Sequence, residues 1–178
     1  MRIIKTSYFL LTIIILSGCQ TMKPIHTVNY VDLKRFMGDW YVIATIPTFI
    51  ETDAFNAIES YRLDKDGTIA TTFRFNKGSL DGPLKEYHPR GFVRDTQSNA
   101  VWGMQFIWPF KAEYRIIYLD DDYSVTVIGR TKRDYVWIMS RVPAIPAAEY
   151  TRIINFLKEQ GYDIGKLRKV PQKDNQSA

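Results

Sequence analysis

The chain has 178 residues and a formal net charge of +5, with 46% hydrophobic and 14% aromatic residues. This length predicts a single domain, and this composition predicts a core large enough to fold without a metal or a disulfide. Arg2 and Lys5 contribute to the positive excess from a segment that we expect to be removed. The remaining excess is too small to indicate nucleic-acid binding.

The first 18 residues have the pattern of an export signal. A positive start is followed by the apolar run 8–16, which is shorter than the about 20 residues that a membrane-spanning helix needs. The sequence Leu16-Ser17-Gly18-Cys19 then resembles the bacterial lipobox. This resemblance implies cleavage before Cys19, which would carry N-palmitoyl and S-diacylglycerol groups. A cysteine with no such role is the alternative.

The lipobox also implies where the mature chain resides. Gln20 follows the cysteine in place of the aspartate that is typical of inner-membrane retention, so the resemblance implies the outer membrane. We expect a signal peptide at 1–18, a tether at 19–30, a folded domain at 31–171 and a flexible tail at 172–178. Cys19 is the only cysteine, so an intrachain disulfide is excluded.

The folded part begins with a short helical turn and continues as strands. Residues 31–37 predict the turn, with Asn29 or Asp32 as its N-cap. Eight segments rich in β-branched and aromatic residues follow between turn signals, namely 40–46, 56–63, 68–75, 86–94, 100–107, 113–119, 123–129 and 135–141. The fourth is the weakest, because Pro89 cannot donate to a strand ladder. Eight short strands at this spacing favour an antiparallel barrel or sandwich.

A helix closes the domain. Tyr150, Ile153, Ile154 and Leu157 recur at helical spacing within 147–160. We expect this apolar stripe to cover the outer wall of the strand structure, since we expect no second domain that could receive it.

Two motifs carry a resemblance to the lipocalin family. Gly38-Asp39-Trp40-Tyr41 looks like the family's first-strand signature, and residues 133–141 look like the end of its last strand. The resemblance covers about residues 28–170 and is strongest to the bacterial outer-membrane, apolipoprotein D-like subgroup. It implies an all-β fold: an eight-stranded antiparallel up-and-down calycin β-barrel with the C-terminal α-helix on its outer wall. It also places Gly38, Trp40 and Arg141 at the barrel floor.

A barrel of eight strands can hold one small ligand or be filled by its own side chains. Taking Trp40 as inward, alternation places Val42, Ala44 and Ile46 inside. Similarity to lipocalins adds Ala57, Glu59, Tyr61, Thr71, Phe73, Phe75, Phe92, Met104, Phe106, Tyr114, Ile116, Trp137 and Met139. Aromatic walls with small residues between them suit an apolar ligand. Glu59 would meet a basic headgroup, Arg74 or Arg90, or would face water if the register is shifted by one.

The loops at the open end carry apolar residues. The resemblance makes the loop at 51–55, with Ile50 and Phe55, a lid. Trp108-Pro109-Phe110 forms an aromatic turn that contacts a membrane or a partner, or packs on the rim.

These features predict a binding protein for a fatty acid, lysophospholipid or similar lipid, serving lipid storage, repair or transport. We expect no cofactor, metal or nucleic acid, because His26 and His88 lack metal-ligand spacing and no catalytic motif is present. The alternatives are a lipocalin-type enzyme acting on a bound lipid and a structural envelope lipoprotein.

Overall fold

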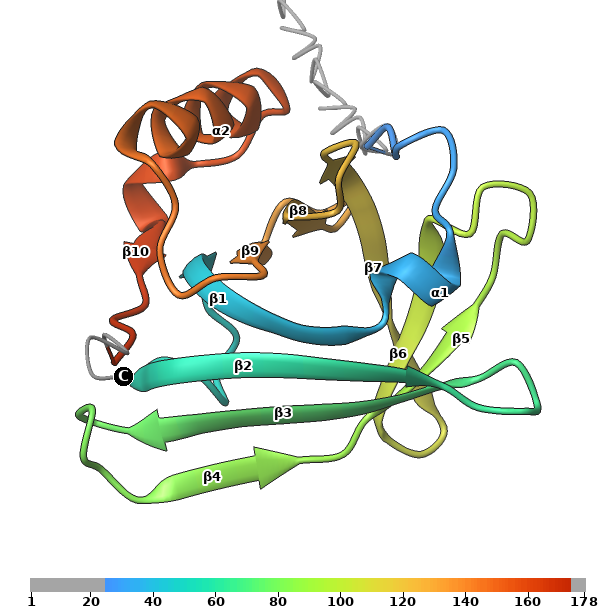
Figure 1. The fold of residues 1–178 in the computed structure, drawn as a ribbon, viewed down its shortest axis with the longest axis horizontal. Coiled ribbons are helices and arrows are strands. Elements are labelled where there is room, and N and C mark those ends of the chain that lie inside the picture. The colour runs from blue at the N-terminus through green and yellow to red at the C-terminus, as the bar shows by residue number, and fades with distance from the viewer. Residues whose placement is uncertain (1–24, 174–178) are drawn as a thin grey trace, which may run out of the picture.

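The strands of the computed structural model, which describes residues 25–173, form one antiparallel sheet that closes into an eight-stranded barrel (Figure 1). The barrel strands are β1 (Gly38–Ile46), β2 (Ala54–Leu63), β3 (Ile69–Lys77), β4 (Leu84–Tyr87), β5 (Arg90–Val93), β6 (Val101–Ile107), β7 (Phe110–Leu119), β8 (Val125–Gly129) and β9 (Val136–Ser140). Consecutive strands pair along the sheet except at β4, which pairs only with β3, and β1 pairs with β9. This confirms the predicted fold class.

The fourth barrel strand is interrupted at Pro89. Its two halves, β4 and β5, both pair with β3, but only β5 continues to β6. The interruption follows from the missing N–H of proline, which cannot join the ladder.

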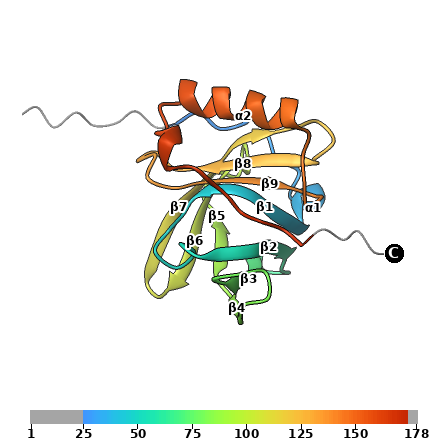
Figure 2. The same ribbon diagram turned by 90° about the vertical axis from the view of Figure 1, so that its left-hand side faces the viewer.

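The helix α2 (Ala147–Glu159) lies on the outer wall of the barrel (Figure 2). Ile153 and Leu157 of α2 are buried against Val127 of β8 and Ile138 of β9. The chain turns after α2 at Gly161, whose φ of +85° lies in the region that glycine adopts without strain.

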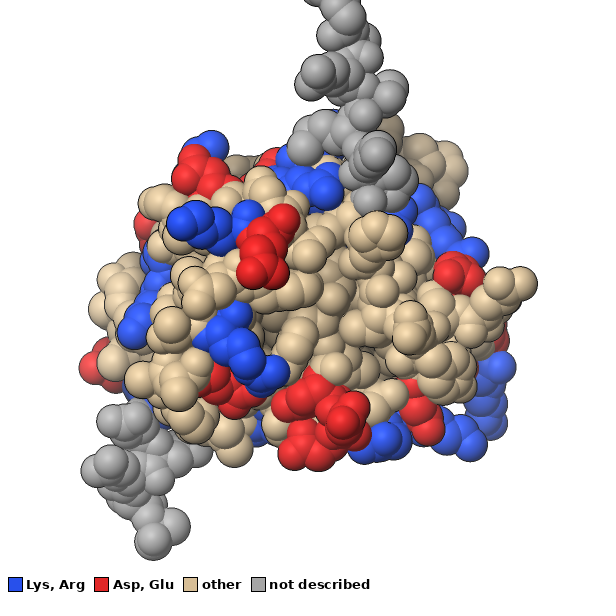
Figure 3. All heavy atoms as spheres, turned by 90° about the horizontal axis from the view of Figure 1, so that it is seen from above, with Lys and Arg blue, Asp and Glu red and all other residues tan. Residues whose placement is uncertain are grey.

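On the face seen in Figure 3, positive and negative side chains are interspersed and neither sign covers the face.

The chain before the barrel packs against it from Ile25 onward. Ile25 is buried in the cluster beneath α2, and the Val28 N–H donates to the Ile116 carbonyl. The predicted tether at 19–30 is therefore too long, because its last residues belong to the folded unit. Cys19 and the predicted signal peptide lie outside the described residues.

A short helix then crosses the end of the barrel. The helix α1 (Leu33–Phe36) begins at Asp32, whose carboxylate accepts from the Lys34 and Arg35 N–H groups. Asp32, one of the two predicted caps, thus provides the partner for the first free N–H groups of the helix. No helix among residues 25–173 is long and apolar enough to cross a bilayer.

The C-terminal segment fills a gap between β1 and β2. After α2 come the 3-10 helix η1 (Ile164–Lys166) and the strand β10 (Arg168–Lys169), which pairs with β1. The Gln172 Nε2 then donates to the carbonyls of Val42 at 2.7 Å and Ala57 at 3.2 Å. We call residues 168–172 the seam segment. The predicted flexible tail therefore begins too early at 172, because Gln172 bridges two barrel strands.

Candidate ligand-binding site

One end of the barrel is closed by the three residues predicted for its floor. The Arg141 guanidinium lies 3.8 Å from the Trp40 ring centre, and it donates to the Asp39 carbonyl at 2.8 Å. Gly38 has a φ of +96°, and a side chain there would meet Arg141 Nη1 at 3.3 Å. Glycine is thus required both for the backbone conformation and for the close approach of the guanidinium.

Aromatic rings fill the half of the barrel next to this floor. Trp102 and Tyr114 stack with ring centres 5.1 Å apart and planes at 8°. Phe36 of α1 packs edge-on against Trp102 at 5.4 Å, and Tyr61 packs edge-on at 5.9 Å. Sequence reasoning did not select Trp102, although it alternates with the predicted Met104 and so shares its face. These rings confine any ligand to the other half.

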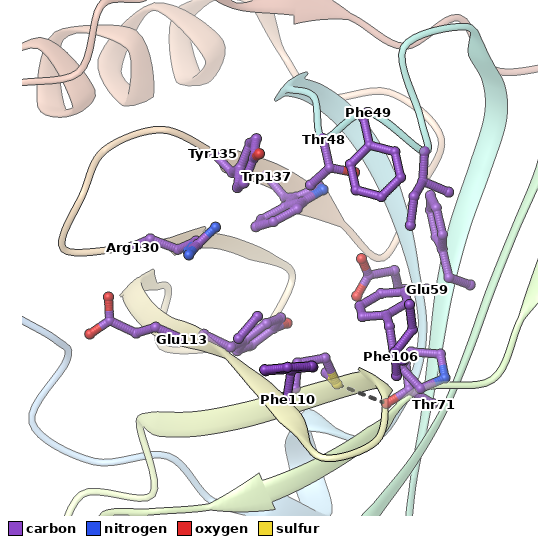
Figure 4. Close-up of a pocket in the computed structure, with 17 residues that line it drawn as sticks. Thr48, Phe49, Glu59, Thr71, Phe106, Phe110, Glu113, Arg130, Tyr135 and Trp137 are labelled. Carbon is purple, nitrogen blue, oxygen red and sulfur yellow. Dashed lines mark hydrogen bonds between the residues drawn. The ribbon is translucent and has the colours of Figure 1, made fainter.

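The open half holds a cavity of about 280 Å³, lined almost entirely by carbon (Figure 4). This volume is near the lower end of the range for small-molecule sites, about 300–1,000 Å³. Seven of the predicted residues line it: Glu59, Thr71, Phe73, Met104, Phe106, Tyr114 and Trp137. Six others share the inner core cluster without lining the cavity: Val42, Ala57, Tyr61, Phe75, Ile116 and Met139.

Ala44 and Ile46 do not face the interior, which corrects the prediction. Both belong to the cluster between the barrel and α2. The cause is an irregularity in β1, where Val42 pairs with Met139 and Ala44 already pairs with Ile138. A bulge inserts one extra residue and so reverses the alternation beyond it.

Phe92 also points away from the cavity. Gly91 is the residue of β5 that pairs with the inward Met104, while Phe92 pairs with Gly103. The Lys111 ammonium lies 3.3 Å from the Phe92 ring centre. Phe92 was predicted to face the cavity, and this prediction is wrong, because its ring lies on the outer surface in contact with Lys111.

Apolar side chains surround the cavity mouth. Phe49, in the β1–β2 loop, is 83% exposed, and Phe110, where β7 begins, is 76% exposed. Both line the cavity, and neighbouring Trp108 is 82% exposed. The aromatic turn is therefore largely exposed beside the mouth, and both of its predicted roles, contact with a membrane or partner and packing on the rim, stay predictions. The other lining residues that sequence reasoning did not assign to the cavity are Thr48, Ile50, Pro89, Ile107, Ala112, Glu113, Arg130 and Tyr135.

The inner end of the cavity carries a carboxyl group. Glu59 is only 9% exposed, and it neighbours the floor residue Trp40 in the β1–β2 pairing. The Tyr61 hydroxyl donates to Glu59 Oε2, and the Tyr61 and Tyr114 hydroxyl oxygens are 2.7 Å apart. Burial raises the pKa of Glu59 to about 8, and the nearby Glu51 carboxylate adds to the rise. The group is therefore largely protonated at neutral pH.

The arginines considered as partners of Glu59 are elsewhere. Arg74 pairs with Asp39 at 3.4 Å, and Arg90 lies 3.6 Å from Asp66. The inward direction of Glu59 excludes the alternative in which it faces water, and the outer-face positions of both arginines exclude the predicted ion pairs.

Glu51 fixes the β1–β2 loop to the last strand. Its carboxylate accepts from the Trp137 indole N–H at 3.1 Å and from the Thr48 N–H at 2.9 Å. The Arg168 Nη2 donates to the Glu51 carbonyl at 2.9 Å. Burial raises the pKa of Glu51, and these hydrogen bonds oppose the rise. Sequence reasoning missed this role, because a loop glutamate gives no signal of burial.

Comparisons with known proteins agree with this geometry. The family model for a Lipocalin-like domain matches residues 31–172. The chain is 30% identical to Temperature-induced lipocalin-1 of Arabidopsis thaliana, over 85% of each chain. It is 28% identical to the Outer membrane lipoprotein Blc of Escherichia coli strain K12, over 87% of this chain and 89% of that protein. Among solved structures, insecticyanin from Manduca sexta is similar with a TM-score of 0.66 at 16% identity, over 84% and 85% of the two chains.

Proposed function

Because the chain belongs to the lipocalin family, we propose that its barrel binds an apolar ligand such as a fatty acid, a lysophospholipid or a similar lipid. The observation that carries this proposal is the carbon-lined cavity of about 280 Å³, open at the end opposite the floor. Transfer of each methylene from water into such a cavity contributes about 0.8 kcal/mol, so a short alkyl segment gains several kcal/mol before ordering costs.

The proposal includes attachment to the outer membrane through acylated Cys19. Two features support it: the lipobox-like Leu16-Ser17-Gly18-Cys19, and similarity to proteins named outer membrane lipoproteins. The tethered barrel would store, repair or transport lipids at that membrane. Mass spectrometry of the protein from bacterial membranes should show an N-terminal Cys19 carrying diacylglycerol and acyl mass, and Cys19→Ser should abolish membrane attachment. An unmodified N-terminus at residue 1 in the membrane fraction would overturn this part.

Binding in the cavity is tested by filling it. Thr71 lines the cavity from β3, whereas its neighbour Thr72 points to the outer face, where its hydroxyl lies 3.4 Å from His88 Nδ1. We expect Thr71→Trp to reduce the affinity for a displaceable fluorescent fatty acid at least about tenfold, since a tryptophan would occupy the ligand volume. Thr72→Trp is the matched control and should bind normally.

Both variants should remain folded by circular dichroism. Normal binding by a folded Thr71→Trp variant would show that lipid does not enter this cavity. A barrel filled by its own side chains, as expected for a purely structural envelope protein, is disfavoured by the open half of the interior.

A further inference from the structure

Among the described residues, the cavity contains one ionisable side chain that has no partner of opposite charge. Three of the residues that line the cavity have acidic or basic side chains: Glu59, Glu113 and Arg130. Glu113 pairs with Arg115 at 2.6 Å, and Arg130 pairs with Asp134 at 3.4 Å. Within residues 25–173, Glu59 forms no ion pair; its one hydrogen-bond donor is the hydroxyl of Tyr61. Figure 4 shows its carboxyl group directed into the cavity, on the side opposite Glu113 and Arg130.

The groups around Glu59 supply no positive charge. Tyr61 from β2 and Tyr114 from β7 contribute hydroxyls, while β1 contributes the apolar Trp40. The Glu51 carboxylate, which carries charge of the same sign, adds to the rise in the pKa of Glu59. Thr71 and Phe73 from β3 are uncharged, and Arg168 is engaged with the β1–β2 loop. The inner end of the cavity is therefore polar, and it favours a ligand group that carries positive charge.

We propose that the cavity selects amphiphiles with a cationic amine, and that the ammonium group pairs with Glu59 while the alkyl chain extends toward the mouth. This inference rests on the proposed function, because it assigns the headgroup of the ligand bound in that same cavity. An ammonium would supply the counterion that the protein does not. A carboxylate in the same place would oppose the ionisation of Glu59, because two like charges in a site that excludes water repel each other.

Protonation of Glu59 determines how strongly the amine binds. Because burial raises its pKa to about 8, forming the ion pair at pH 7 requires loss of a proton at a cost of about tenfold in affinity. An alkylammonium group titrates near pH 10, so it stays charged while Glu59 ionises. Amine affinity should therefore rise by about tenfold per pH unit between pH 6 and 7 and level off above pH 8 to 9.

The test compares three probes of equal chain length, namely dodecylamine, dodecanol and dodecanoate, titrated calorimetrically into the purified full chain. We expect the amine to bind at least about tenfold more tightly than the other two at pH 8, and this preference to disappear in Glu59→Gln. Glu86→Gln is the matched control, since Glu86 is an exposed acid of β4 that pairs with His88 outside the cavity. It should keep the preference.

The outcomes separate this inference from the proposed function. If all three probes bind equally, or if the amine preference survives in Glu59→Gln, the assignment of Glu59 is wrong while lipid binding stands. If none of the three binds, the proposed function itself fails. Should Glu59→Gln not fold, the pH series on the unaltered chain decides, because an amine affinity that is flat between pH 6 and 8 overturns the ion pair.

Discussion

The guanidinium of Arg141, beyond the end of the last barrel strand, covers the indole of Trp40 in the first, with 3.8 Å between the guanidinium carbon and the ring centre. The same guanidinium donates to the carbonyls of Arg35, Phe36 and Met37, which precede β1. One side chain therefore joins α1, β1 and the end of β9. Lysine could not replace it, because a single ammonium cannot reach this spread of acceptors.

Arg141→Met should reduce the free energy of unfolding by about 2–4 kcal/mol, since it removes the cation–π contact and the hydrogen bonds that the guanidinium donates to backbone carbonyls. Urea unfolding measures this loss. Arg62→Met is the control, because Arg62 is exposed and pairs with Asp64 at the surface. It should cost less than about 1 kcal/mol. Equal losses in the two variants would contradict a central role for Arg141.

Glu59 should make the protein less stable as the pH rises. Its pKa is about 8 in the folded chain and about 4.5 when unfolded, so between these values the unfolded state releases a proton that the folded state retains. The contribution of Glu59 is thus fully present below pH 4.5, declines by up to about 1.4 kcal/mol per pH unit, and is lost above pH 8.

The measurement is the difference in free energy of unfolding between the unaltered chain and Glu59→Gln, followed from pH 5 to 9. We expect the variant to gain relative stability up to about pH 8 and the difference to level off above it. A constant difference would show that Glu59 ionises in the folded protein as it does in water.

Leu157→Ala should destabilise the protein without affecting the cavity. Leu157 is fully buried between α2 and the barrel wall, and truncation of such a leucine costs about 2–5 kcal/mol. Ligand affinity should stay within about twofold in the folded variant, since the cluster lies outside the barrel. Lys158→Ala, one residue along on the exposed face of α2, is the control and should be neutral in thermal unfolding. A Leu157→Ala variant that unfolds like the control would contradict the packing of α2.

Gln172→Ala should cost about 1–2 kcal/mol of unfolding free energy, because the side chain donates to one carbonyl in β1 and one in β2. Lys173→Ala is the neighbouring control, since Lys173 makes a surface ion pair with Asp81. Hydrogen exchange should show faster opening near Ala57 in the Gln172 variant only. Unchanged exchange there would mean that Gln172 does not hold the two strands together.

Much of this fold could be predicted because its signals are local. Strand segments are bounded by turn residues, and the apolar stripe of α2 has a clear helical period. Trp40 and Arg141 could be placed because the flanking motifs resemble a family. The contact between these two residues could not be predicted from local secondary-structure propensity, because the sequence around one residue does not identify the other as its partner.

The cavity was harder to predict, because alternation fails wherever a strand is irregular. The bulge after Val42 turns Ala44 and Ile46 toward α2, and no residue type marks it. The break at Pro89 was visible in the sequence, but it left the direction of Phe92 open. Glu51 lies in a loop, and its burial depends on Trp137 and Arg168, which are far away in the chain.

The pairing of β1 with β9 and with the seam segment has a consequence for how the protein forms. β1 is the first strand to be synthesised, yet its partners on these sides, β9 and β10, are the last two strands of the described chain. Contacts between residues so distant in sequence slow folding, because loop-closure entropy is lost before the contacts are gained. The nascent chain can form hairpins early, but the ring of strands is completed only after translation has nearly ended.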